Sequence, residues 1–98
     1  MSPRHIGALS LLGWYLMVPP LASKNGPVVR EAPLGKWDTL SVFDAAADCQ
    51  TRLEAIQDSA VGRIKAHPVG EVSPQRLRDL QLLSAECIAT DDPRLKSN

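Results

Sequence analysis

Between residues 41 and 65, apolar residues recur at intervals of three and four, which is the pattern of one face of an α-helix. The repeat consists of Val42, Ala46, Cys49, Leu53, Ile56, Ala60 and Ile64. Ser41 followed by Asp44 is typical of a helix start, with Asp44 itself as the alternative N-cap. At the other end His67 precedes Pro68, and a residue before proline is steered away from helical dihedral angles. The pattern therefore predicts a long helix.

A second apolar repeat follows Ser73-Pro74. Serine accepts a hydrogen bond from a free amide at a helix start, and proline is tolerated at the first helical position. The repeat consists of Leu77, Leu80, Leu83 and Cys87. Two helices joined by a short turn, here 66–72, run antiparallel and bury their apolar faces on each other. The predicted fold class is all-α, an antiparallel two-helix hairpin over 41–89 followed by a polar tail over 90–98.

The beginning of the chain reads as an export signal. One arginine, Arg4, precedes an uncharged apolar run from Ile6 to Val18, and Pro19-Pro20-Leu21-Ala22 then supplies a helix-breaking, small-residue ending. We therefore expect residues 1–22 to be a signal peptide or a short N-terminal membrane anchor. Cleavage after Ala22 would place Pro20 where a small residue is usual, so an uncleaved anchor over residues 6–22 is the alternative.

Prolines and glycines crowd the next segment and break regular structure. We expect residues 23–40 to be a flexible tether between the signal or anchor helix and the hairpin. Trp37 and Phe43 supply most of the aromatic surface after the leader. We expect them to close the open end of a small core, and the alternative is contact with a partner.

The two cysteines are predicted to form a disulfide that clasps the hairpin. Cys49 lies 21 residues before Gly70 and Cys87 lies 17 residues after it, so at about 1.5 Å per helical residue both reach a similar height. Both also belong to the apolar repeats. An exported protein meets an oxidising environment, which favours the bond. The alternative is two free buried thiols that act as small hydrophobes.

Charge and motifs argue against several function classes. The 98 residues carry 11 basic and 11 acidic side chains, so there is no basic field of the kind that nucleic-acid binding requires. No spacing typical of a catalytic site, a metal site or a cofactor site is present. His67 is the only histidine after the leader. We expect no enzymatic activity, no metal and no cofactor; an enzyme would need a pocket that brings His67 close to an aspartate or a cysteine.

Two segments resemble a group of small exported bacterial proteins that are uncharacterised. One is Trp37 followed by Phe43-Asp44 and then by Cys49; the other runs from Cys87 through Asp91-Asp92-Pro93-Arg94-Leu95. The resemblance implies a bacterial exported origin and cysteine pairing, and it implies no activity.

The function predicted from the sequence is that of a small non-enzymatic protein of the bacterial envelope, with an interaction or structural role. The expected location is periplasmic or secreted, and the expected partner is an envelope protein or a second copy of the chain. The alternative is a membrane-tethered protein whose residues 6–22 remain as an inner-membrane anchor, which would be its only contact with the membrane.

Overall fold

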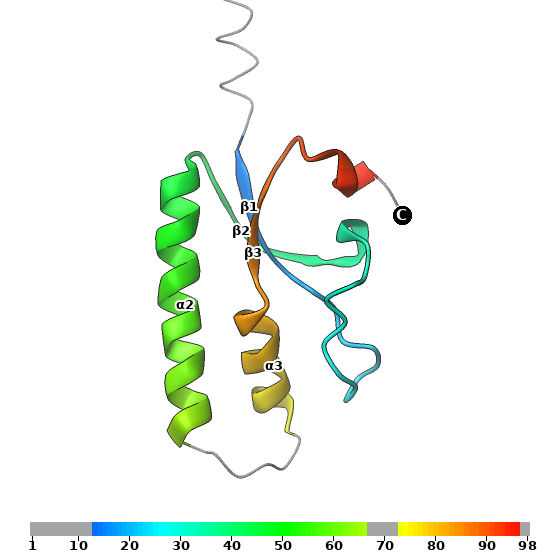
Figure 1. Ribbon diagram of the computed structural model, residues 1–98, viewed down its shortest axis with the longest axis vertical. Helices are drawn as coiled ribbons and strands as arrows, with labels where there is room; N and C mark the ends of the chain where they lie inside the picture. The colour runs from blue at the N-terminus through cyan, green and yellow to red at the C-terminus, as the bar shows by residue number, and fades with distance from the viewer. Residues whose placement is uncertain (1–12, 67–72, 97–98) are drawn as a thin grey trace, which may run out of the picture.

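The computed structural model describes residues 13–66 and 73–96, and in this part of the chain a three-stranded antiparallel sheet is combined with two α-helices (Figure 1). In chain order the elements are β1 (Trp14–Val18), the 3-10 helix η1 (Leu34–Lys36), β2 (Asp38–Phe43), α2 (Ala46–Ala66), α3 (Pro74–Leu83), β3 (Glu86–Ala89) and the 3-10 helix η2 (Pro93–Lys96). The sheet order is β2-β1-β3. The predicted all-α hairpin is therefore wrong, because the fold is a mixed α/β structure.

The largest correction concerns Trp14–Val18, which was assigned to a signal or anchor helix and instead forms the central strand. Trp14 pairs with Phe43 of β2 on one side and with Ala89 of β3 on the other. Leu16, Met17 and Val18 are at most 4% exposed. A central strand covered on both faces is a continuous apolar run, and a leader has the same appearance in a sequence.

Successive side chains of β1 enter two different apolar clusters, as the two-residue period of a strand requires. Leu16 and Val18 pack on the side of α2, in a cluster with Cys49 and Ala85. Met17 points to the opposite face and packs with buried residues of the η1 region and of β3; these are Leu34, Trp37 and Ile88. The sheet is thus covered by helices on one face and by the η1 and η2 segments on the other.

The long helix predicted from the sequence is present, but α2 begins at Ala46 rather than near Ser41. Its inward residues are those of the predicted repeat, with Cys49 and Ala60 fully buried and Leu53 and Ile56 packed against the core. Val42, the first member of the predicted repeat, belongs to β2 instead.

The start of α3 agrees with the prediction, and its end does not. Ser73 Oγ accepts a hydrogen bond of 3.2 Å from the Arg76 amide, and Pro74 is the first helical residue. The helix ends at Leu83, so Cys87 lies in β3 rather than on a helix. The two helices contact each other and run in opposite directions (Figure 1), yet they form one part of the fold rather than a self-sufficient hairpin. Most of the predicted turn over 66–72 lies outside the described residues.

The segment expected to be a flexible tether is folded onto the sheet. Leu21 bridges to Val28, and the Val29 amide donates to the Pro20 carbonyl at 2.8 Å. The Gly26 amide closes this turn by donating to the Ser23 carbonyl at 3.0 Å, and a Cβ on Gly26 would lie 2.9 Å from the Ser23 backbone nitrogen. The chain then forms η1 and enters β2. Proline and glycine here shape an ordered turn, so the prediction of a tether is wrong.

Candidate functional site

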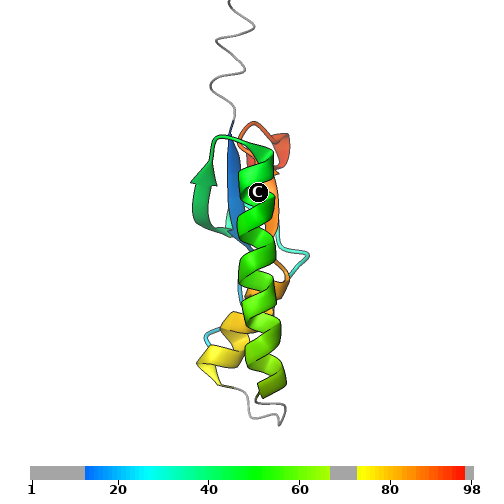
Figure 2. The ribbon, with the colours of Figure 1, turned by 90° about the vertical axis from the view of Figure 1, so that its left-hand side faces the viewer.

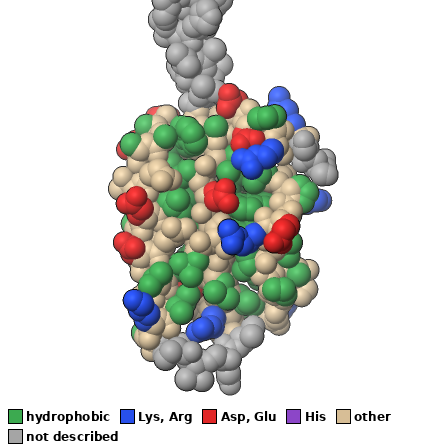
Figure 3. All heavy atoms as spheres, in the orientation of Figure 1, with side chains coloured by type: hydrophobic (Ala, Val, Ile, Leu, Met, Phe, Trp, Pro, Cys, Tyr) green, Lys and Arg blue, Asp and Glu red, His purple; other side chains and the backbone are tan. Residues whose placement is uncertain are grey.

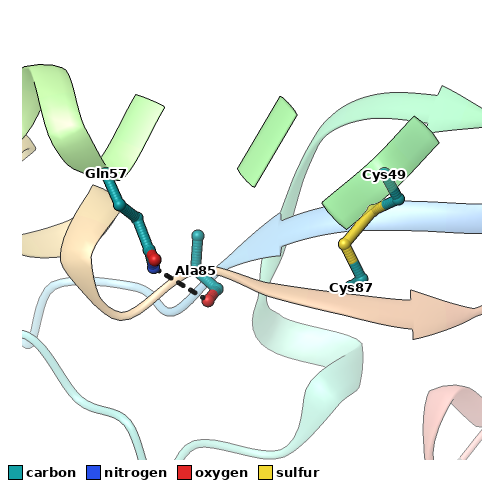
Figure 4. The surroundings of a disulfide bond; sticks show 4 residues. All are labelled: Cys49, Gln57, Ala85 and Cys87. Atoms are coloured by element: carbon teal, nitrogen blue, oxygen red, sulfur yellow. Dashed lines mark hydrogen bonds between the residues drawn. A yellow bond between two sulfur atoms is a disulfide. The ribbon is translucent and has the colours of Figure 1, made fainter. Parts of the chain in front are cut away.

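The predicted disulfide between Cys49 and Cys87 is present, with 6.1 Å between the Cα atoms. It joins α2 to β3, whereas the sequence suggested a link between two helices (Figure 4). Cys49 is fully buried in the cluster formed with Leu16, and Cys87 is the residue of β3 that pairs with Leu16. The bond therefore crosses from the helix layer to the sheet at the core.

Gln57 provides a second link between α2 and the start of β3. Its Nε2 lies 3.3 Å from the Leu82 carbonyl, 3.2 Å from that of Leu83 and 3.5 Å from that of Ala85 (Figure 4). The last carbonyls of a helix have no partner within the helix. One side chain of α2 therefore caps the end of α3 and holds the turn that leads to Cys87.

A third link pairs the two helices near their other ends. Asp79 is 3% exposed, and its Oδ1 accepts from Arg63 Nε and Nη2, both at 2.8 Å, and from Gln75 Nε2 at 3.0 Å. A buried carboxylate requires such partners. All three links fix the scaffold.

The described sheet has two edge strands, β2 and β3, and β2 carries the more exposed apolar side chain, Val42. Among the described strands β2 pairs only with β1, so one row of its backbone amides and carbonyls has no strand beside it. Val42 is 63% exposed, and Thr39 is exposed as well. Figure 2 shows β2 at the side of the sheet, projecting beyond α2. An open strand edge is a ready template for pairing with another chain.

Trp37 and Phe43, the candidate partner contacts, lie in two different places. Trp37 is 8% exposed, and its Nε1 donates to the Ala32 carbonyl at 2.8 Å, so the ring is a core element of the η1 side. Phe43 is half-buried and packs against the cluster on the α2 side. Trp37 is therefore a core residue, and contact of either aromatic residue with a partner stays a prediction.

A depression of about 330 Å³ lies beside η1 and β3. Its lining combines two arginines, two glutamates and an apolar floor: Arg30, Glu31, Ala32, Pro33, Leu34, Trp37, Glu86 and Arg94. Arg94 is already held by Asp92 through two side-chain hydrogen bonds. Because both basic and acidic side chains line the depression, it does not favour a ligand of one charge over the other.

The rest of the described surface carries mixed charge. On the face shown in Figure 3, acidic and basic side chains are interspersed with apolar ones, and neither sign forms a continuous field. Val61, Leu80 and Leu83 on the helices are only 37–38% exposed, which is much less than Val42. Within residues 13–66 and 73–96, no three His, Cys, Asp or Glu side chains gather as a metal site would require. His67 lies outside the described residues.

The sequence-based prediction did not include β2, although the composition of the segment indicates a strand. Thr39-Leu40-Ser41-Val42-Phe43 contains β-branched and aromatic residues and no charge, which is a composition typical of strands. The predicted helical repeat included Val42, so this strand was assigned to the start of the helix.

None of the helices in the described part of the chain is long and apolar enough to cross a bilayer.

Comparisons of the chain with protein-family models, with curated proteins and with solved structures found no match. The resemblance to small exported bacterial proteins therefore stays a prediction, and the functional conclusion depends on the geometry described above.

Proposed function

We propose that this chain is a small non-enzymatic protein that works outside the cytoplasm, in the bacterial periplasm or after secretion, by contact with another macromolecule. The observation that carries this proposal is the open edge of β2, where Val42 is 63% exposed on a strand that has a single neighbour. The binding mode is addition of a strand to that edge, in which backbone hydrogen bonds supply affinity and alternate side chains supply specificity.

The disulfide supports the location. Such bonds persist in oxidising compartments and are rare where cellular thiols keep cysteines reduced. The Cys49–Cys87 bond is compatible with an exported protein, and it holds α2 against β3. A rigid sheet suits strand addition, because less ordering free energy is lost when a preorganised edge is paired.

The position of β1 limits how export can occur. Cleavage after Ala22 would remove Trp14–Val18 and with it the strand that joins β2 to β3. The exported form must therefore keep the chain from Gly13 onward, since Gly13 exchanges hydrogen bonds of 3.0 Å with Thr90. The membrane-tethered alternative would require Trp14–Val18 to leave the sheet for the bilayer, and we do not favour it.

The location is tested by thiol labelling of the full chain in bacterial cells, after rapid acid quenching and denaturation. We expect a maleimide-polyethylene-glycol reagent to shift the protein only after reduction, and we expect the protein in the periplasmic or secreted fraction. Free thiols and a purely cytoplasmic fraction would overturn the proposed location.

The contact is tested in the same cells with a photo-crosslinking amino acid in place of Val42. The matched control carries it in place of Asp58, an exposed residue of α2. We expect a discrete macromolecular adduct at position 42 and none at position 58. Absence of any adduct at position 42, in protein shown to be folded and oxidised, would count against a contact function.

A further inference from the structure

We infer that the partner at the open edge of β2 is a second copy of this chain, joined by antiparallel β2–β2 pairing into a continuous six-stranded sheet. The inference rests on the proposed contact function and assigns its partner. It follows from the register of β2 and from the chemistry of its edge.

The register of β2 makes it complementary to itself. Ser41 pairs with Leu16 and Thr39 pairs with Met17, so Leu40 is an extra residue in the ladder, that is, a β-bulge. The bulge shifts the alternation by one residue. Thr39 and Val42 consequently share the face of β1 that carries Met17 and Tyr15, even though they are three residues apart.

When the two-fold axis of an antiparallel pair is placed between Leu40 and Ser41, at the bulge, Thr39 lies opposite Val42 of the second copy, and Asp38 lies opposite Phe43 of the second copy. Each pair shares one face of the sheet. The bulges of the two copies then lie side by side at the axis. A bulge would put β2 out of register with a regular strand, but the second copy has the same bulge at the same place. Self-complementarity of this kind is what a two-fold interface requires.

The chemistry of this edge favours pairing. Strand edges that remain free in soluble proteins usually carry charged side chains, proline or a β-bulge. β2 begins at the exposed Asp38 and contains the bulge at Leu40, which its own copy can match. From Thr39 to Phe43 the strand has neither charge nor proline, and Thr39 and Val42, its two exposed residues on the Met17 face, are β-branched. β-Branched side chains pack well against neighbours on the pleated surface of a sheet.

The charges at the ends of β2 are compatible with this arrangement. Lys36 precedes the strand, Asp44 follows it, and both are exposed. In this register Asp44 of one copy faces Trp37 of the other, so Lys36 and Asp38, one on each side of Trp37, lie equally near it and their opposite charges offset each other. Asp38 meets an aromatic residue rather than a carboxylate, so no like charges are placed directly opposite each other.

The association is tested by sedimentation velocity on the purified, oxidised chain over a wide concentration range. We expect a monomer–dimer equilibrium whose dissociation constant rises at least about tenfold in Val42→Lys, because the variant places two buried ammonium groups in one interface. The control is Val61→Lys on α2, where an exposed valine is also replaced but the dissociation constant should not change. A monomer at every concentration, or equal effects of the two variants, would overturn the inference.

The register is tested by photo-crosslinking from position 42 in a mixture of isotopically light and heavy copies. We expect light-to-heavy crosslinks to residues 38–41, and crosslinks confined to α2 or α3 of the other copy would overturn strand pairing. Should the purified chain stay monomeric while position 42 captures a different macromolecule in cells, self-pairing would be excluded and the proposed contact function would stand. Failure of both the dimer and the cellular adduct would remove both proposals.

Discussion

Gln81 and Pro19 are joined by a buried hydrogen bond across 62 residues of sequence: the Gln81 side-chain amide donates to the Pro19 carbonyl at 2.9 Å. Pro19 directly follows β1 and is itself fully buried. The contact joins the segment after β1 to α3. The residues that resemble a leader are therefore held both by strand pairing with β2 and β3 and by this hydrogen bond.

Removing that segment should abolish the fold. A chain that begins at Ser23, as cleavage after Ala22 would produce, lacks the strand between β2 and β3 and the apolar side chains of Leu16 and Val18. We expect no cooperative thermal unfolding by circular dichroism and poor dispersion of its amide NMR signals. Cooperative unfolding of this shortened chain with an intact Cys49–Cys87 bond would contradict the prediction.

Gln81→Leu should lower the free energy of unfolding by about 1–3 kcal/mol, since it leaves the buried Pro19 carbonyl without its donor. Urea denaturation followed by fluorescence or circular dichroism measures the difference. The matched control is Gln50→Leu on the exposed side of α2, where a change within about 0.5 kcal/mol is expected. Equal losses in the two variants would show that the Gln81 bond has no special role.

The disulfide should be a major source of stability. The cysteines are separated by 38 residues, for which the chain-entropy model gives a contribution of about 4 kcal/mol. The double variant Cys49→Ala, Cys87→Ala and the reduced parent chain should lose similar amounts in urea denaturation, the alanine variant slightly more because it also loses buried sulfur atoms. A loss below about 1 kcal/mol in both would mean that α2 and β3 are held together without the bond.

The sequence was sufficient for the elements whose signals are local. The apolar repeat that includes Cys49 and Leu53 marks α2, and Ser73-Pro74 marks the start of α3, because periodicity and capping depend only on neighbouring residues. The disulfide was also predicted, although from a helical position for Cys87 that is wrong. With two cysteines only one pair is possible, and the expectation of export and of burial favoured its oxidation independently of that geometry.

The sheet could not be predicted from the sequence, for three separate physical reasons. In β1 both faces are buried, which removes the alternation that identifies a half-exposed strand. In β2 the bulge at Leu40 breaks the alternation. In β3 the four-residue spacing from Leu83 to Cys87 continues the repeat of α3, although the helix has already ended. The open edge of β2 could not be predicted either, because an edge strand can be identified only when the strand order is known.

Two glycines should respond in opposite ways to alanine. Gly62 lies inside α2 with open space where a Cβ would stand, so Gly62→Ala should stabilise the protein by about 0.5–1 kcal/mol through reduced backbone entropy. At Gly13 an added Cβ would lie 2.9 Å from the Phe43 carbonyl oxygen, a backbone atom that cannot move without disturbing β2. Gly13→Ala should therefore destabilise, and thermal unfolding of both variants measures the two signs. Stabilisation by both would show that the close approach between Gly13 and Phe43 is absent in solution.

The ion pair between Asp92 and Arg94 should be measurable in the acid titration of the Asp92 carboxyl. The Arg94 side chain donates to Asp92 Oδ1 at 3.1 Å and to Oδ2 at 2.8 Å, and the Arg94 backbone amide also donates to Oδ1 at 2.9 Å. The side-chain bonds, followed by the backbone bond, lower the pKa of Asp92 below its ordinary value. Because the folded carboxyl has the lower pKa, its contribution to stability is complete above the pKa of the unfolded state and is lost as pH falls through that of the folded state.

Arg94→Gln should therefore raise the pKa of Asp92 toward its ordinary value, as measured by the side-chain carboxyl shift in an NMR titration from about pH 2 to pH 6. Arg94→Lys should produce a smaller rise, because it keeps the charge and loses the two-pronged hydrogen bond. The backbone donor survives in both variants, so part of the depression should remain in each of them. Both side chains are accessible to solvent, and we expect the effect to appear in this pKa rather than in the overall free energy of unfolding. An Asp92 pKa that is the same in the parent and in Arg94→Gln would show that the guanidinium does not hold this carboxylate in solution.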